Sequence, residues 1–380
     1  MCRRGEHESA AMVTIRDIAR EVGLSVTTVS RALGGHDDVA ESTRARIHEV
    51  ARRLDYHPNA AARSLQNSRS NALGLVIPLT LHRSYDAFWL EFIGGVAAVC
   101  ARNGFDLSLS AADAPVRVPE AFQRWIRGRR VDGLIVCDVR SEDSRLAYLT
   151  RHRVPFVAFG RTTGPLDFPY VDVDGAAGVL QAMAHLTELG HHRIGYLGVD
   201  PAFGFSHFRL AGYREGLARA GLPYDPELVL EGVTEATAAG AARRLCSLPR
   251  PPTAVFAAVD FLALALLRVA RASGIAVPAD LSLVVFDDNV PVQHAEPPLT
   301  ALSQSNQRLG EEAAELLLAR VADPHGPLTQ RLVVPTLVVR GSTAPPAVPA
   351  PGWHEAASTA AASFGAVPTV GPAEPKRVPS

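Results

Sequence analysis

The chain has 380 residues, 47% of them apolar and 20% charged, the composition of a globular protein large enough for more than one domain. Its formal net charge is −1 and its single lysine is Lys376, so neither a general affinity for nucleic acid nor Schiff-base chemistry on a buried lysine is indicated. No apolar run could span a bilayer, no signal-peptide pattern opens the chain, and the cysteine spacing fits neither a metal site nor a disulfide framework. We therefore expect a cytoplasmic protein with reduced thiols, no metal and no cofactor.

The first structured stretch carries the signals of two short helices. After a leader over residues 1–12, which we expect to be disordered, Thr14 can cap a helix and Asp17 can reach back to it. Gly23 ends this helix and Ser25 caps the next. The expected inward face of the pair is apolar: Ile15, Ile18, Ala19, Val22, Val29, Ala32 and Leu33. The spacing predicts a helix-turn-helix.

A third helix over residues 41–54 closes a three-helix cluster, and Pro58 breaks the pattern. Asn59 can then cap a short alanine-rich helix over 60–66, which is too short to be stable alone in water. Residues 13–70 hold nine Arg against seven Asp and Glu, which is only a weak positive footprint.

From residue 71 the periodicity changes to short apolar runs that alternate with helical patterns. Such alternation predicts parallel sheets with right-handed crossovers, and its length predicts two α/β lobes. The expected strands are Leu73–Ile77, Phe105–Ser110, Val131–Cys137, Pro155–Phe159, Ile194–Gly198, Thr253–Ala258 and Leu281–Phe286, with a closing strand pair at Leu332–Val334 and Leu337–Val339. Residues 341–380 are rich in Pro and Ala and are expected to form a disordered tail.

Three segments of residues 14–70 closely resemble the head of the LacI/GalR family of bacterial transcription regulators. They are Thr14-Ile15-Arg16-Asp17-Ile18-Ala19, Val26-Thr27-Thr28-Val29-Ser30-Arg31 and Tyr56-His57-Pro58-Asn59-Ala60-Ala61-Ala62-Arg63-Ser64-Leu65. The resemblance runs to about Arg340. It implies a helix-turn-helix domain (13–58), a hinge helix and linker (59–70), and a body (71–340) of two periplasmic-binding-protein-like, Rossmann-like lobes. It also implies three crossings between the lobes, expected near Tyr170–Asp172, Pro298–Ala301 and Pro327–Leu332.

The resemblance assigns the DNA-reading roles. Val26 and Thr27 would read bases, with Arg31 as a third reader that can take guanine bidentately. Short donors would position phosphates, and they are Thr14, Ser25, Thr28 and Ser30. Capping within the helix is the structural alternative for these hydroxyls. In the hinge, Asn59 begins the helix, Ala62 allows two copies to approach in the minor groove, and Leu65 is the wedge that opens the central base step. The alternative for Leu65 is that it merely covers the body.

An effector site is implied between the lobes. Arg209 matches the ligand-gripping Arg of the family and Asp287 the acid that accepts from ligand hydroxyls, a pairing suited to sugars. Phe88 and Trp89 match an aromatic pair at the cleft mouth, although aromatics that open a helix are often core. Arg161 follows a strand end and either reaches the cleft or is a surface charge. Where sugar-responsive members carry Asn, this chain has Val259, which removes one expected hydrogen bond to a ligand.

The resemblance therefore implies a repressor-type regulator, not an enzyme, that binds a near-palindromic operator as a homodimer and responds to a small molecule. A sugar is favoured, because the loop at residues 79–87 and the stretch from 159 to 172 resemble the α-glucoside branch. The rivals are a periplasmic sugar-binding protein, which would need a signal peptide and lack residues 14–70, and an enzyme using the cleft, for which no catalytic motif is visible. The pair His191-His192 invites a metal interpretation, but no further ligand is spaced to join it.

Overall fold

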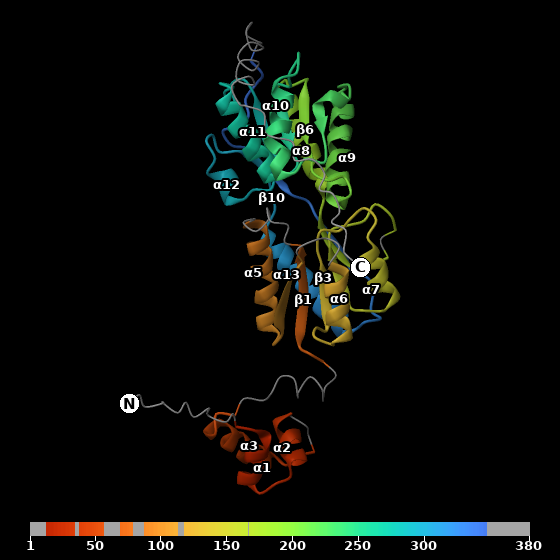
Figure 1. Ribbon diagram of the computed structural model, residues 1–380, viewed down its shortest axis with the longest axis vertical. Coiled ribbons are helices and arrows are strands. Elements are labelled where there is room, and N and C mark those ends of the chain that lie inside the picture. Colours follow the sequence, from red (N-terminus) through yellow and green to blue (C-terminus); the bar gives the residue numbers. More distant parts are fainter. Residues whose placement is uncertain are drawn as a thin grey trace, which may run out of the picture. The chain divides into compact units, whose positions relative to one another are not determined.

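A computed structural model describes residues 13–34, 38–56, 69–78, 87–112, 118–165 and 167–347. The predicted hinge residues Asn59, Ala62 and Leu65 lie outside these ranges, as do the leader 1–12 and residues 348–380. The chain divides into two compact units after Asn71, a head and a body. The described head consists of α1 (Ile15–Val22), α2 (Val26–Leu33) and α3 (Glu41–Arg53) (Figure 1).

The capping predicted for the head is confirmed. The Thr14 backbone N–H donates to the Asp17 carboxylate over 3.0 Å, and Ser25 Oγ accepts from the backbone N–H of Thr28 over 3.1 Å. Between the two helices Gly23 is left-handed, with φ of 68°. The three helices bury one small core, in which the side chains of Ile18, Val29, Ala32 and Ile47 are 0% exposed. This core holds α2 with its other face open to solvent.

The body contains two six-stranded sheets. Lobe 1 has the strand order β11-β5-β4-β3-β1-β2, with the bounds β1 Ala72–Pro78, β2 Asp106–Ala112, β3 Gly133–Val136, β4 Phe156–Phe159, β5 Tyr170–Val173 and β11 Gln330–Val333. Lobe 2 has the order β12-β10-β9-β8-β6-β7, with the bounds β6 Ile194–Leu197, β7 Val229–Leu230, β8 Ala254–Ala257, β9 Ser282–Phe286, β10 Thr300–Ser303 and β12 Thr336–Val338. All pairings are parallel except that of β10 with β12.

Helices cover both sheets, as the alternation predicts. Those of lobe 1 are α5 (Ala87–Arg102), α6 (Val118–Arg127), α7 (Ser144–Arg151) and α13 (Asn306–Ala322). Those of lobe 2 are α8 (Gly175–Glu188), α9 (Gly204–Arg219), α10 (Glu235–Cys246), α11 (Asp260–Ala272) and α12 (Val290–Gln293), with a short 3₁₀ turn η2 (Pro226–Leu228). Helices α5 and α13 pack almost backbone to backbone: a Cβ on Gly310 would lie 2.1 Å from the Phe92 carbonyl oxygen.

Three crossings join the lobes, but each lies a few residues after the predicted place. The chain leaves lobe 1 after β5, returns from lobe 2 between β10 and α13, and leaves again between β11 and β12. The three predicted crossing stretches overlap the strands β5, β10 and β11, so their bounds are wrong by a few residues. The two strands expected near residues 332–339 are present as β11 and β12, but they do not pair with each other: β11 pairs with β5 and β12 with β10.

The body also extends past the predicted boundary at residue 340. Ser342 is 0% exposed, donates to the Leu283 carbonyl over 2.5 Å and accepts from the Thr300 backbone N–H over 2.8 Å. The disordered tail predicted from 341 is thus wrong for residues 341–347, which attach to the sheet of lobe 2. Within the described residues, no helix is both long and apolar enough to cross a membrane.

Candidate functional site

The outer face of α2 carries the predicted DNA-reading residues. Val26 is 42% exposed and Thr27 is exposed beside it, at the first turn of the helix. Ser25 and Thr28 are hydrogen-bonded to each other through their hydroxyls over 2.8 Å, so both serve the cap, and Ser30 is half-buried. The Thr14 hydroxyl donates to Asp17 over 2.7 Å. The hydroxyls of Thr14, Ser25 and Thr28 are therefore hydrogen-bonded within the head, while Val26 and Thr27 are exposed to solvent.

Arg31 does not stand alone on this face. Its guanidinium lies 2.6 Å from the Asp38 carboxylate, with the side chains 49% and 52% exposed. A guanidinium has donors to spare, but those shared with Asp38 cannot also take guanine in the same geometry. Base recognition by Arg31 therefore competes with this ion pair.

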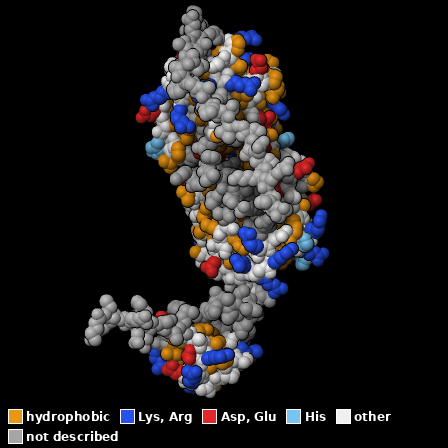
Figure 2. Space-filling view, in the orientation of Figure 1, with side chains coloured by type: hydrophobic (Ala, Val, Ile, Leu, Met, Phe, Trp, Pro, Cys, Tyr) orange, Lys and Arg blue, Asp and Glu red, His pale blue; other side chains and the backbone are white. Residues whose placement is uncertain are grey.

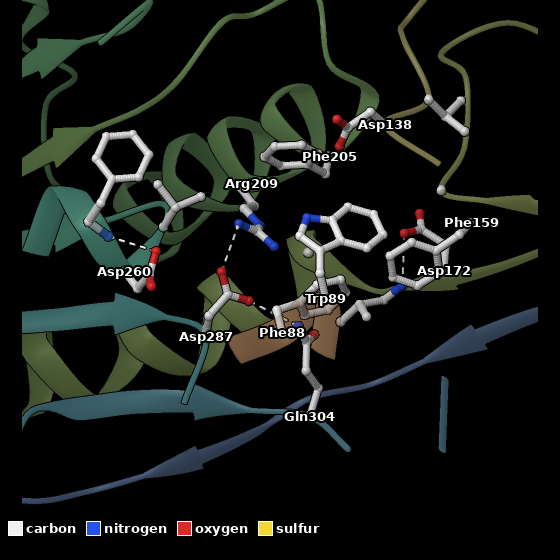
Figure 3. A pocket seen from close by; sticks show the side chains of 16 residues that line it. Phe88, Trp89, Asp138, Phe159, Asp172, Phe205, Arg209, Asp260, Asp287 and Gln304 are labelled. Carbon is white, nitrogen blue, oxygen red and sulfur yellow. Dashed lines mark hydrogen bonds and ion pairs between the residues drawn. The ribbon is translucent and has the colours of Figure 1, made fainter. Parts of the chain in front are cut away.

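A cavity of about 220 Å³ lies between the two lobes of the body. Four of the five predicted effector residues line it, namely Phe88, Trp89, Arg209 and Asp287 (Figure 3). It lies where the carboxyl ends of strands from both sheets meet, the usual place for a ligand in open α/β folds. The aromatic pair also packs into the core, with Trp89 only 8% exposed and its ring 5.1 Å from that of Phe88. Both interpretations of these aromatics therefore apply.

Arg209 is held by the protein from several sides. It extends from α9, is 7% exposed and donates through Nη1 to the Ala258 carbonyl. Its guanidinium carbon lies 3.5 Å from the ring centroid of Phe286 and 4.8 Å from that of Phe205, and Nη1 lies 3.9 Å from the Asp287 carboxylate. A guanidinium stacked between rings keeps its plane, which fixes the direction of the remaining donors.

Asp287 follows β9 directly and has φ of 80°, a left-handed conformation uncommon for a residue other than Gly. The Gln304 side-chain amide donates to its Oδ1 over 2.9 Å. Asp138 is the corresponding residue of lobe 1, because it follows β3 closely and is also left-handed, with φ of 50°. The backbone carbonyl of Asp138 accepts a hydrogen bond from the Arg145 side chain over 2.8 Å. Backbone strain of this kind persists where surrounding structure fixes it, and it clusters at functional sites.

Arg161, the fifth predicted effector residue, does not line the cavity. Its Nε donates to Asp172 Oδ2 over 2.7 Å, and its guanidinium carbon lies 4.2 Å from the ring centroid of Phe208. Asp172 does line the cavity. Burial raises the pKa of the Asp172 carboxyl, and the neighbouring Arg161 guanidinium opposes that rise. In this geometry Arg161 acts on the cavity by holding Asp172.

Sequence reasoning missed much of the acidic and aromatic lining. Asp138, Asp260, Phe159, Phe205 and Gln304 complete the cavity. Asp138 follows a predicted strand and Asp260 begins a helix, so a search for polar residues at strand ends would have found both. Among the residues that the structure describes, the cavity is lined by the guanidinium of Arg209 and by four carboxylates, of which Asp172 is also paired with Arg161; the four are Asp138, Asp172, Asp260 and Asp287. A ligand with hydroxyl groups suits this charge balance better than an anion.

The two lobes also touch directly beside the cavity. Arg140, which follows β3, forms an antiparallel bridge with Phe203, which precedes α9. Ser141 N–H donates to the Ala202 carbonyl over 2.7 Å, and Gly204 N–H donates to the Val139 carbonyl over 3.0 Å. The side chain of Arg140 adds an ion pair of 3.3 Å with Asp200. We call this contact between residues 139–141 and 200–204 the interlobe clasp.

The histidine pair is separated by its surroundings. His191 is 1% exposed, with Nδ1 2.9 Å from Thr253 Oγ1 and Nε2 3.0 Å from Ser282 Oγ, whereas His192 is exposed. Nε2 also lies 2.9 Å from the Ala344 carbonyl oxygen, so His191 fixes the C-terminal segment to the sheet. No cluster of three metal-ligating side chains occurs among the residues that the structure describes.

Known proteins match the head and the body alike. The family model for bacterial regulatory proteins of the lacI family matches residues 14–59, and that for a periplasmic binding protein-like domain matches residues 183–343. The HTH-type transcriptional regulator AglR of Rhizobium meliloti (strain 1021) is 34% identical over 338 residues, which is 88% of this chain and 95% of AglR. The HTH-type transcriptional regulator CelR of Thermobifida fusca is 35% identical over 339 residues, 87% of this chain and 98% of CelR. The solved CelR–cellobiose complex has a TM-score of 0.68 at 32% identity and covers 87% of this chain and 99% of that one.

Proposed function

The chain belongs to the LacI family of bacterial regulatory proteins, and from this premise we propose that it is a cytoplasmic homodimeric transcription repressor whose operator affinity is set by a sugar in the cavity between its lobes. The observation that carries the effector half is the position of Arg209. Its guanidinium is fixed by the rings of Phe205 and Phe286 and opens, together with Asp287, on a cavity bounded by both lobes. A ligand there touches both lobes and can bias their relative angle.

For the operator, we propose that Val26 contacts a thymine methyl, Thr27 a base edge, and Arg31 a guanine after leaving Asp38. Thr14, Ser25 and Thr28 would contact phosphates, a role supported by their place around the start of α1 and α2. Ser30, which lies further along α2, would contact a phosphate from the same helix. Asn59, Ala62 and Leu65 would form the hinge in the minor groove. Because a two-fold protein reads a two-fold site, we expect a near-palindromic operator.

For the effector, we propose a neutral sugar rather than a sugar phosphate. Among the described lining residues, carboxylates outnumber guanidinium groups even when Asp172 is counted as paired with Arg161, so an added phosphate would lie among like charges, which cost several kcal/mol. Phe88 and Trp89 would cover an apolar sugar face, and Asp287 and Arg209 would bridge hydroxyls. The CelR structure is described as a cellobiose complex, which favours a disaccharide. Val259 lines the cavity without a polar group, so the ligand would be held by one hydrogen bond fewer there.

A melting-temperature screen of neutral mono- and disaccharides and their phosphates against the full chain tests this proposal. A ligand present at one hundred times its Kd stabilises the native state by about 2.7 kcal/mol, which is readily seen as a shift. We expect a neutral sugar to raise the Tm and its phosphate to leave it unchanged. A shift with phosphates only would contradict the effector class while leaving operator binding to be tested by footprinting.

A further inference from the structure

Exposed arginines gather at one end of lobe 1. In a parallel sheet crossed by helices, the helix ends lie with the starts of the next strands, and here those loops supply the charge. The six residues, which we call the basic base, are Arg102, Arg127, Arg129, Arg130, Arg151 and Arg153. None of these guanidinium groups lies within 4.0 Å of a carboxylate that belongs to the described ranges. Figure 2 shows basic side chains together at the lower end of the body.

Fewer carboxylates share this end. They are Asp106 at the start of β2, Asp132 before β3, Asp167 before β5 and Asp323 after α13. Asp323 already accepts from the backbone N–H of His325 over 3.1 Å. The balance at the basic base is therefore positive, although the whole chain has a formal charge of −1.

Two of the arginines occupy positions that a side chain disfavours. Arg129 and Arg153 follow the last turns of α6 and α7 with φ of 47° and 52°. Such left-handed positions after a helix usually hold Gly, because a Cβ there costs roughly 1–2 kcal/mol. The matching positions after four other helices hold glycine, at Gly23, Gly104, Gly221 and Gly274, whereas Asp55 occupies this position after α3 with φ of 50°. Attraction to the helix dipole accounts for Arg102, Arg127 and Arg151 in the last turns of their helices. At positions 129 and 153, by contrast, glycine would adopt the left-handed backbone conformation at a lower free-energy cost than arginine.

The chain from the DNA-binding head enters the body at the same end. Strand β1 begins at Ala72, and the Asp132 backbone N–H donates to the Ala72 carbonyl over 2.8 Å, next to Arg129 and Arg130 in sequence. The basic base thus lies at the end of lobe 1 where the chain from the head enters the body. Duplex DNA carries one negative charge per 1.7 Å of its axis, and guanidinium groups pair bidentately with phosphates.

Resting on the proposed operator binding, we propose that the basic base binds the phosphate backbone of DNA that flanks the operator, with Arg129 and Arg153 as its principal contacts. This binding adds affinity without sequence preference. It also makes the total affinity depend on flanking length and on salt. Removing one arginine–phosphate pair makes the slope of log K against log[salt] shallower by about 0.9.

The full-length Arg129→Gly/Arg153→Gly variant tests this, because glycine relieves the left-handed strain and the fold is expected to keep or raise its Tm. Operator affinity is measured over a salt series on a probe with long random flanks and on one trimmed to the palindrome. We expect weaker binding and a shallower salt slope on the long probe, by about 0.9 for each phosphate no longer paired, and wild-type values on the trimmed probe. The charge-matched control is Arg244→Ala/Arg271→Ala on exposed last-turn positions of lobe 2, which should behave as wild type on both probes.

Two outcomes would overturn the proposal in distinguishable ways. If the variant keeps the wild-type slope on the long probe while both proteins bind the trimmed probe, the basic base has no part in DNA binding, but operator binding stands. If wild type fails to bind either probe specifically, the proposed function itself is wrong, and the basic base falls with it.

Discussion

A Cβ on Gly204 would lie 1.9 Å from the carbonyl oxygen of Arg161, so lobes 2 and 1 meet here at a distance that only a hydrogen atom permits. Gly204 opens α9, the helix that carries Arg209, and Arg161 holds Asp172 at the cavity wall. Gly204 belongs to the interlobe clasp and Arg209 to the proposed effector site, so helix α9 connects the two.

We expect Gly204→Ala to weaken effector binding by about 5- to 150-fold, because a Cβ at this position would overpack the contact between the lobes at a cost of about 1–3 kcal/mol. Titration calorimetry with the sugar found by the melting screen measures the change. Gly240→Ala is the matched control, since a Cβ at that exposed position of α10 meets no atom within 4 Å. Equal affinities for wild type and Gly204→Ala would show that the clasp does not hold the effector-binding state.

Asp38→Asn should strengthen operator binding by about 1.4- to 5-fold, which corresponds to the 0.2–1 kcal/mol of an exposed ion pair. The substitution keeps the shape of the side chain but releases Arg31 to the groove. Glu49→Gln removes the same charge from α3 and controls for the general electrostatic effect. If both substitutions give the same gain, Arg31 is not the residue released.

Asp287→Asn should reduce effector affinity by about 10- to 150-fold, since a hydrogen bond to a charged partner contributes about 1.5–3 kcal/mol. The Gln304 amide can still donate to the Asn oxygen, so the side chain keeps its position. Asp288→Asn is the neighbouring control: Asp288 pairs with Arg340 at 2.8 Å and does not line the cavity. We expect Asp288→Asn to lower the Tm and leave the affinity unchanged, and the reverse pattern would refute the assignment.

His191→Gln should reduce the loss in the free energy of unfolding that occurs when the pH falls from about 7.5 to about 5.5. Burial lowers the pKa of the His191 imidazole below the unfolded value of about 6.5, so the unfolded chain takes up the proton first. The neutral His191 imidazole therefore stabilises the fold fully above about pH 6.5, and this stabilisation is lost as the pH falls through the pKa of the folded state. Urea unfolding at about pH 7.5 and pH 5.5 should show a smaller loss for His191→Gln than for wild type, while exposed His192→Gln should keep the wild-type loss.

Local rules are sufficient to predict the head. Thr14, Asp17, Gly23 and Ser25 act within three or four residues of themselves, so their spacing predicts the helices and the turn directly. In the body, the crossings implied by the family resemblance overlap β5 and β10. Such four-residue strands are defined by their neighbours in the sheet, such as β11 beside β5, which is 160 residues away in sequence. Ser342 likewise looks like part of a polar tail until its partner Leu283 is known.

The residues that line the cavity likewise fall into those that could be predicted from the sequence and those that could not. Family resemblance predicts Arg209 and Asp287, and both line it. It does not predict Asp138 and Asp172, because only the tertiary arrangement brings the ends of β3 and β5 to the same place as α9. The ion pair of Arg161 with Asp172 shows the limit of reasoning from strand ends. Arg161 does follow the end of a strand, as predicted, but its side chain binds Asp172 and does not itself line the cavity.

The late crossings have a consequence for how the protein is made. Lobe 1 lacks α13 and β11 until residue 333 has been synthesised, although five of its strands are complete by residue 173. During translation these strands lack α13, which covers the apolar faces of α5 and β3, until nearly all of lobe 2 has been synthesised. A nascent chain stalled near residue 300 therefore exposes an open edge at β5, and lobe 1 is the half of the body that most needs protection by chaperones.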